Sequence, residues 1–104
     1  MTQTAQEFTR AASLLKAMAH PERLAILFRL ACGAQNLDEL AEYTGLPPGE
    51  LSRHIDRLRR MGIVGCTRYL RIVEYRLSSD TVRRLLAVLD TNPQHIQTKR
   101  KNPA

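Results

Sequence analysis

The sequence predicts a mainly α-helical domain with a small β-hairpin, in which four helices precede the hairpin and one follows it. Three observations lead to this prediction. Apolar residues recur at helical spacing over most of the chain, two short helical segments meet across a tight turn, and one stretch of β-branched and aromatic residues precedes the last helical segment. With 104 residues and 43% hydrophobic content, the chain suits one modest core rather than two.

The first two helices occupy the N-terminal third of the chain. Between residues 3 and 19, Phe8, Leu15 and neighbouring alanines recur every three or four positions, which predicts the first helix. In "HPERLAILFRLACG" a proline favours the start of a second helix, and Gly33 is expected to be a left-handed stop. This helix is mostly apolar, so we expect it to be buried.

The next two helices are short and lie close together. "NLDELAEYTG" places Asn36 three residues before Glu39, the spacing of a capping box, and ends at Gly45. "LPPGELSRHIDRLRRMG" begins with two prolines, which break the chain and start a fourth helix that runs to about Met61. Two such helices joined by the tight "TGLPPG" turn have the arrangement of a helix-turn-helix.

The C-terminal part of the chain contains a hairpin and a final helix. "IVGCTRYLRIVEYRL" predicts two strands, but no Gly, Asn or Asp between Thr67 and Ile72 signals their turn. "SSDTVRRLLAVLD" has a Ser or Asp cap and an apolar stripe, and predicts the last helix. We expect residues 1–91 to form one folded domain, and residues 92–104 to form a flexible basic tail. The element order is that of a winged helix-turn-helix.

The fourth helix separates oily and charged faces. At ~100° per residue, Leu51, Ile55 and Leu58 share one face, which is expected to pack on the core. The opposite face carries Gly49, Arg53, Asp56, Arg57 and Arg60. The major groove of DNA admits one helix and offers guanine acceptors to arginine, so this face suits DNA. An arginine-rich helical face can also be merely solvated, which leaves a protein-interaction module as an alternative.

The charge of the chain is concentrated around this helix and the hairpin. Residues 46–76 hold seven arginines and three acidic residues, a balance of +4 within a formal net charge of +6. Such a balance favours a polyanionic partner. At the hairpin tip Arg68 and Arg71 bracket Tyr69 and Leu70, and the arginines are placed to enter the minor groove or contact phosphates. Tyr69 and Leu70 have an alternative role, covering a neighbouring apolar surface.

Three stretches of the chain resemble the ArsR/SmtB family of bacterial winged-helix repressors. They are "LLKAMAHPERLAILFRL", "LDELAEYTGLPPGELSRHIDRLRRMGIV" and "VEYRLS", within residues 14–78. The resemblance implies a homodimer that is joined by its first and last helices, binds an inverted-repeat operator in double-stranded DNA, and is released by a signal. Its base-reading positions would fall on Pro48, Gly49, Ser52, Arg53 and His54.

Residues and resemblance together predict two sets of site residues. The expected DNA contacts are Pro48, Gly49, Ser52, Arg53, His54, Arg57, Arg60, Arg68 and Arg71. The expected dimerisation residues are Phe8, Leu15, Leu85, Leu86 and Leu89. Both terminal helices carry an apolar stripe that a monomer of this size would struggle to cover.

No sensing site follows from the sequence. Metal sensors of the ArsR/SmtB family carry Cys-x-Cys in the third helix, or Asp-x-His with His-x-x-Glu in the last helix. This chain has neither motif. We expect no metal site and no cofactor, and His54 has no evident metal-site partner. Thiol sensors of the family pair cysteines in the second and last helices, but the last helix here has none. Cys32 and Cys66 are therefore expected to be buried, inert thiols, with a redox-responsive repressor as the alternative.

Other classes of protein fit the sequence poorly. No apolar run approaches the roughly 18 residues of a membrane span, and "MTQTAQEFTR" lacks the features of a signal peptide, so we expect a cytoplasmic protein. No Ser/His/Asp or Cys/His pairing has local support, and no glycine loop is arranged to hold a phosphate. The sequence therefore favours a DNA-binding regulator and not an enzyme.

Overall fold

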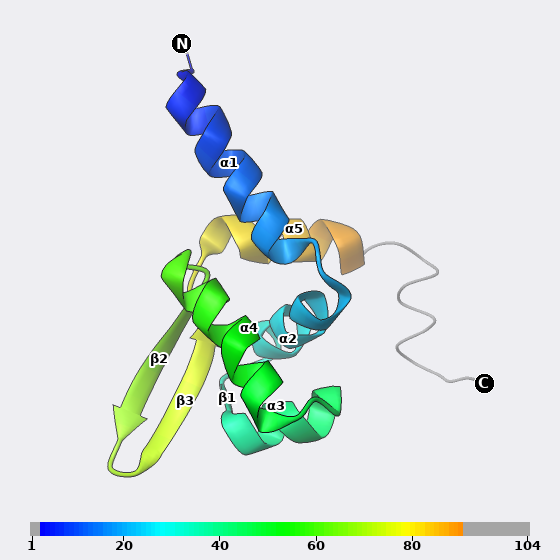
Figure 1. Ribbon diagram of the computed structural model, residues 1–104, viewed down its shortest axis with the longest axis vertical. Coiled ribbons are helices and arrows are strands. Elements are labelled where there is room, and N and C mark those ends of the chain that lie inside the picture. The colour runs from blue at the N-terminus through cyan, green and yellow to red at the C-terminus, as the bar shows by residue number, and fades with distance from the viewer. Residues whose placement is uncertain (1–2, 91–104) are drawn as a thin grey trace, which may run out of the picture.

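A computed structural model describes residues 3–90, and in that range five α-helices and three short strands form a winged helix-turn-helix (Figure 1). The elements are α1 (Ala5–Met18), α2 (Pro21–Ala31), β1 (Gln35–Asn36), α3 (Leu37–Thr44), α4 (Pro48–Arg60), β2 (Val64–Tyr69), β3 (Ile72–Leu77) and α5 (Asp80–Asp90). The predicted order of four helices, a hairpin and a final helix is confirmed. The predicted tail, residues 92–104, lies outside the described residues.

Local sequence signals determine where the helices begin and end. The capping box before α3 is present, because the Asn36 side chain accepts from the Glu39 N–H and the Glu39 carboxylate accepts from the Asn36 N–H, both at 2.8 Å. Gly45 ends α3 with φ 74°, as predicted. Gly33, the predicted stop of α2, directly follows the C-cap residue Cys32. Its φ of 153° is positive and favours glycine, but it lies outside the left-handed helical region that the sequence predicted.

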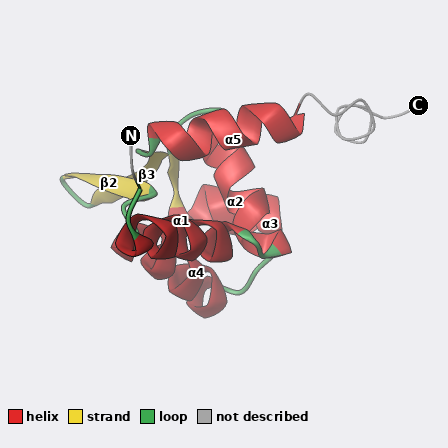
Figure 2. Cartoon of the chain, turned by 90° about the horizontal axis from the view of Figure 1, so that it is seen from above, coloured by secondary structure: helices red, strands yellow, loops and turns green. Residues whose placement is uncertain are grey.

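The hairpin forms the wing, β2 and β3, which projects to one side of the helices (Figure 2). The sheet order is β1-β3-β2, and all pairs are antiparallel. The sequence did not predict β1, which has only two residues and is held by its pairing with β3. Tyr69 pairs with Ile72, so Leu70 and Arg71 form the turn. Leu70 adopts φ 58°, a value that glycine or asparagine usually takes, which explains why the sequence signals the turn so poorly.

The core lies between α2, the inner face of α4, the base of the wing and α5. Leu51, Ile55 and Leu58 are all buried, which confirms the predicted apolar face of α4. Helix α2 contributes Ile26, Leu27 and Leu30, and its predicted burial is also confirmed along this face. Because the inner face of α4 packs against this core, its opposite face lies at the surface.

Candidate nucleic-acid interface

Helix α4 presents the polar residues of its first half to solvent. The helix begins at Pro48, and three later leucine and isoleucine side chains fix its rotation about its own axis. Pro48, Gly49, Ser52 and Arg53 are all exposed. No atom lies within 4 Å of a Cβ built on Gly49, so the backbone there is open to close approach. The positive end of the helix dipole adds to the attraction for a phosphate.

The outer face of α4 carries arginines that lack acidic partners. Arg53, Arg57 and Arg60 are exposed, and none forms an ion pair with a carboxylate among residues 3–90. Arg84 on α5 differs, because it is paired with Asp80 at 2.8 Å. Unpaired guanidinium groups are free to bind phosphate or guanine without first losing an internal partner.

The wing extends this positive surface. Arg68 lies at the end of β2 and Arg71 in the turn, and both are exposed. Tyr69 is 72% exposed and Leu70 is 81% exposed, so neither covers an apolar surface of its own chain. The Arg76 guanidinium, by contrast, donates to the Thr67 hydroxyl within the wing. The wing tip therefore offers two free arginines beside two exposed apolar side chains.

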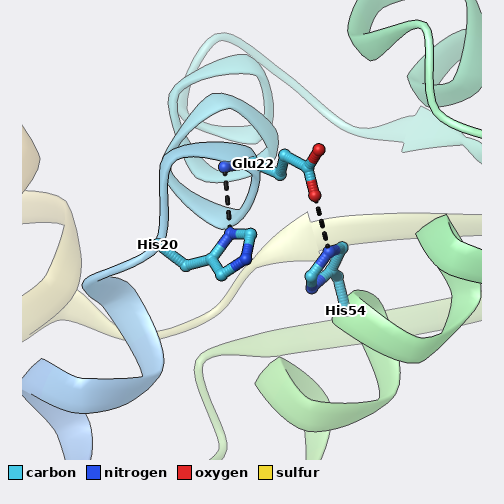
Figure 3. Close-up of side chains that lie close together, drawn as sticks. All are labelled: His20, Glu22 and His54. Atoms are coloured by element: carbon cyan, nitrogen blue, oxygen red, sulfur yellow. Dashed lines mark hydrogen bonds and ion pairs between the residues drawn. The ribbon is translucent and has the colours of Figure 1, made fainter.

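His54 differs from the other predicted DNA contacts because it is tied to α2. Its side chain is only 13% exposed, and its Nε2 lies 3.1 Å from Glu22 Oε1 (Figure 3). Its Nδ1 lies 3.2 Å from Nη1 of Arg23. A guanidinium only donates, so Nδ1 accepts and the proton of the neutral ring sits on Nε2, facing Glu22. Both ring nitrogens have partners inside the chain.

Arg23 connects this histidine to the end of α1. Its Nε donates to the Ala17 carbonyl and its Nη2 to the Lys16 carbonyl. Burial lowers the pKa of Arg23, and the nearby charge of Arg57 lowers it further. One side chain thus joins α1, α2 and α4.

The fold also supplies partners for His54 that the sequence did not reveal. His20 caps α2 by accepting from the Glu22 N–H through Nδ1 at 3.2 Å. Its ring centroid lies 4.8 Å from that of His54. Ligand atoms of His20, Glu22 and His54 all lie within 4.8 Å of one another. The contact between Glu22 and His54 spans 32 positions, and no local pattern signals it.

Comparison with known proteins identifies the family. A family model described as bacterial regulatory protein, arsR family, matches residues 20–65, which contain α2, α3, α4 and the start of the wing. The HTH-type transcriptional regulator YgaV of Escherichia coli is 36% identical over 93 residues, which cover 86% of this chain and 94% of the relative. The chain belongs to the ArsR family of bacterial regulatory proteins.

Solved structures of two other proteins match the fold of this ArsR-family protein over most of the chain. The transcriptional repressor BigR from Xylella fastidiosa matches with a TM-score of 0.76 and 30% identity, over 86% of this chain and 95% of that structure. A homodimeric winged helix-turn-helix DNA-binding domain from Mycobacterium bovis matches with a TM-score of 0.77 and 25% identity, over 98% and 97%.

The ArsR-family chain exposes a second surface, formed by α1 and α5. Helix α1 extends away from the body of the domain, with its C-terminal end beside α5 (Figure 1). A shallow apolar depression between the two helices is lined by Leu15, Met18, Ala19, Leu24, Leu85, Val88 and Leu89. Of the predicted dimerisation residues, Phe8, Leu15 and Leu89 are exposed and Leu85 is half-buried. Leu86 is different, since it is 2% exposed and belongs to the core of the single chain.

Both cysteines of the ArsR-family chain are free thiols. Cys32 is exposed, so the expectation that it is buried is wrong, and Cys66 is half-buried in β2. Cys32 follows the last residue of α2 and faces α5, whereas Cys66 lies beside the end of α4. The two thiols line separate depressions.

Within residues 3–90, no helix combines the length and the apolar character that crossing a membrane requires.

Proposed function

We propose that the protein is a cytoplasmic, homodimeric repressor that binds an inverted-repeat operator through α4 and the wing. The observation that carries the proposal is the unpaired arginine face of α4, which continues into the arginines of the wing tip. This face belongs to the second helix of the helix-turn-helix, and in such domains the second helix enters the major groove.

The roles of the residues follow from their places on α4 and the wing. Ser52 and Arg53, in the first half of the helix, contact base edges, and Pro48 and Gly49 allow the helix start to approach a phosphate. Arg57 and Arg60, further along the same face, contact the DNA backbone. The wing arginines, Arg68 and Arg71, contact the adjacent minor groove or its phosphates.

His54 holds the recognition helix in place and does not itself contact DNA. Both of its ring nitrogens are engaged, and its side chain is largely buried against α2. Its bonds to Glu22 and Arg23 fix α4 relative to α2.

A dimer is the form that explains the exposed apolar surface of α1 and α5. Phe8 and Leu15 are exposed on α1, and Leu89 is exposed on α5. Two chains joined through these helices would each present an α4 to DNA. Half-sites about 34–36 Å apart would then be read together. The homodimeric state of the related Mycobacterium bovis domain supports this arrangement.

Repression is favoured by the relation to BigR, which is a repressor. A dimer on an operator near a promoter would block access of other proteins to the same DNA. The alternative is a repressor that is released by oxidation of a thiol. It would require Cys32 or Cys66 to react.

Selection of DNA fragments from the source genome by the purified protein tests the proposal. We expect recovery of inverted repeats, and for roughly eight phosphate contacts a plot of log affinity against log salt with a slope of about −7. Joint replacement of Arg53 and Arg57 by alanine should abolish operator binding, while Arg84→Ala, which removes one paired arginine from α5, should not. Absence of a preferred sequence together with a flat salt dependence would favour the protein-interaction module.

A further inference from the structure

We propose that His20, Glu22 and His54 form a binding site for a divalent transition metal ion, best matched by Zn²⁺. The three residues come from the start of α2 and from the middle of α4. Their ligand atoms all lie within 4.8 Å of one another, and all three residues are half-buried. No sequence motif accounts for this cluster, and of its three residues only His54 is among the predicted DNA contacts.

The donor set suits zinc. Imidazole nitrogen and carboxylate oxygen bind Zn²⁺ at about 2.0–2.2 Å, so two ligands of a tetrahedral ion lie roughly 3.4 Å apart. His54 Nε2 and Glu22 Oε1 are already 3.1 Å apart. Three protein ligands leave one coordination position for water or a further ligand. The three ligand atoms lie within 4.8 Å of one another, so the third residue has to move closer to the other two when the ion binds.

His20 has a nitrogen to spare for the ion. Its Nδ1 accepts from the Glu22 N–H in the cap of α2, which leaves Nε2 without a role in that cap. Figure 3 shows this second nitrogen on the side of the ring that faces His54. The cap also orients the ring, as outer-shell hydrogen bonds orient metal-binding histidines.

Metal binding and the bond between Arg23 and His54 exclude each other. In the metal-free chain His54 accepts from Arg23 at Nδ1 and carries its proton on Nε2. Coordination through Nε2 leaves the proton of the neutral ring on Nδ1, which then has nothing to offer a guanidinium. Arg23 must release His54, and its charge opposes the ion, so we expect weaker binding than at a four-ligand structural site.

The site would therefore link the ion to the recognition helix. Arg23 also holds the Lys16 and Ala17 carbonyls at the end of α1, so its release from His54 alters the connection between α1 and α4. This regulatory step, unlike the metal site itself, rests on the proposed function in DNA binding.

Zinc titration of the purified full-length protein, without DNA and in competition with a chromophoric chelator, tests the site. We expect one Zn²⁺ per chain. Glu22→Gln keeps an acceptor for His54 and His20→Asn keeps a helix cap, yet each removes a metal ligand. Each variant should weaken Zn²⁺ binding at least about tenfold. Melting curves without zinc check that both variants remain folded.

Controls separate this site from other zinc ligands of the chain. The Cys32→Ser, Cys66→Ser double variant and His95→Gln should bind Zn²⁺ as the wild type does. Three results would refute the site: no stoichiometric Zn²⁺ binding by the wild type, binding by both Glu22→Gln and His20→Asn as tight as by the wild type, or loss of Zn²⁺ binding in the cysteine double variant.

A second measurement addresses the link to DNA. We expect Zn²⁺ to change the operator Kd of the wild type by about fivefold or more, and to leave the ratio of the two Kd values near one in Glu22→Gln. Stoichiometric zinc binding with no change in the wild-type Kd would overturn the link alone. Failure to bind any operator would count against the proposed function and leave the zinc titration intact.

Discussion

Glu22 at the start of α2 and His54 in the middle of α4 are joined by a contact of 3.1 Å between Oε1 and Nε2. The contact connects the scaffold of the domain to α4, the proposed recognition helix. His54 is only 13% exposed and lies one position after Arg53, so a movement of this part of α4 would displace both residues. The orientation of α4 thus depends on a polar network as well as on its apolar face.

Glu22→Ala should weaken both folding and operator binding. It leaves the Nε2 proton of His54 without an acceptor, which costs about 1 kcal/mol for a partly buried group. Glu22→Gln retains an acceptor and should lose much less. Urea unfolding and operator titration in zinc-free buffer measure the two effects. Equal losses in the alanine and glutamine variants would show that the hydrogen bond does not position α4.

The arginines of α4 should differ in what they contribute to DNA binding. Arg53→Ala removes a proposed base contact and should cost about 1–3 kcal/mol while relaxing specificity at one position of each half-site. Arg60→Ala removes a proposed phosphate contact, so affinity should fall for all sequences and the salt slope should become shallower by about 0.9. Titrations on an operator and its single-base variants, repeated at several salt concentrations, distinguish the two. Arg84→Ala is the matched control, and identical behaviour of Arg53→Ala and Arg60→Ala would contradict these roles.

Leu70→Gly should stabilise the wing. Leu70 has φ 58°, a conformation that costs a non-glycine residue about 1 kcal/mol, and its side chain is 81% exposed and buries little. We expect the free energy of unfolding to rise by up to about 1 kcal/mol. Arg71→Gly is the control, since Arg71 lacks a positive φ and glycine there should only add flexibility to the unfolded chain. A loss of stability in Leu70→Gly as large as in Arg71→Gly would mean that the turn is not strained.

Local signals explain why most of the fold could be predicted from the sequence. The cap formed by Asn36 and Glu39, and the apolar face of α4, involve residues within one or two helical turns, so their spacing is visible in the chain. The wing turn at Leu70 could be located only through the pairing of the strands on either side. A turn built from leucine and arginine has no sequence signature.

Long-range contacts explain what the sequence could not predict. Strand β1 exists only because Gln35 and Asn36 pair with β3, some 40 positions later. The partners of His54 come from α2. Cys32 is exposed because of its place directly after the last turn of α2, which its residue type did not reveal. In each case the outcome depends on how separate elements pack, which periodicity within one element does not reveal.

Leu15→Asp together with Leu89→Asp should convert the dimer to a folded monomer. Both side chains are about half exposed in the single chain, at 54% and 45%, so the charges would be tolerated there but not in a joined apolar face. Light scattering after size-exclusion chromatography gives the oligomeric state. Tyr69→Asp with Leu70→Asp places the same charges on exposed apolar residues of the wing tip and should leave the dimer intact. A dimer that survives the first pair of substitutions and not the second would place the interface elsewhere.

Leu86→Ala separates folding from dimerisation on the same helix. Leu86 is 2% exposed within one chain, and its truncation should cost about 2–5 kcal/mol of stability through the cavity that it leaves. Leu89→Ala, three residues further along α5, removes an exposed side chain and should change monomer stability by much less. Urea unfolding of both alanine variants is measured in the Leu15→Asp chain, at a concentration at which light scattering shows a monomer. Equal losses in the two alanine variants would contradict the assignment of Leu86 to the core and Leu89 to the interface.

Cys32→Ser and Cys66→Ser should each retain operator binding, because neither thiol lies on the outer face of α4 or at the wing tip. The exposure of Cys32 makes it the thiol that an oxidant reaches first. Because Cys32 lies neither on the outer face of α4 nor at the wing tip, we expect its modification by peroxide to leave the operator Kd of the wild type unchanged. Mass spectrometry of the treated protein and DNA titration of the same sample measure both. A peroxide-dependent loss of DNA binding that disappears in Cys32→Ser would establish the thiol-responsive repressor instead.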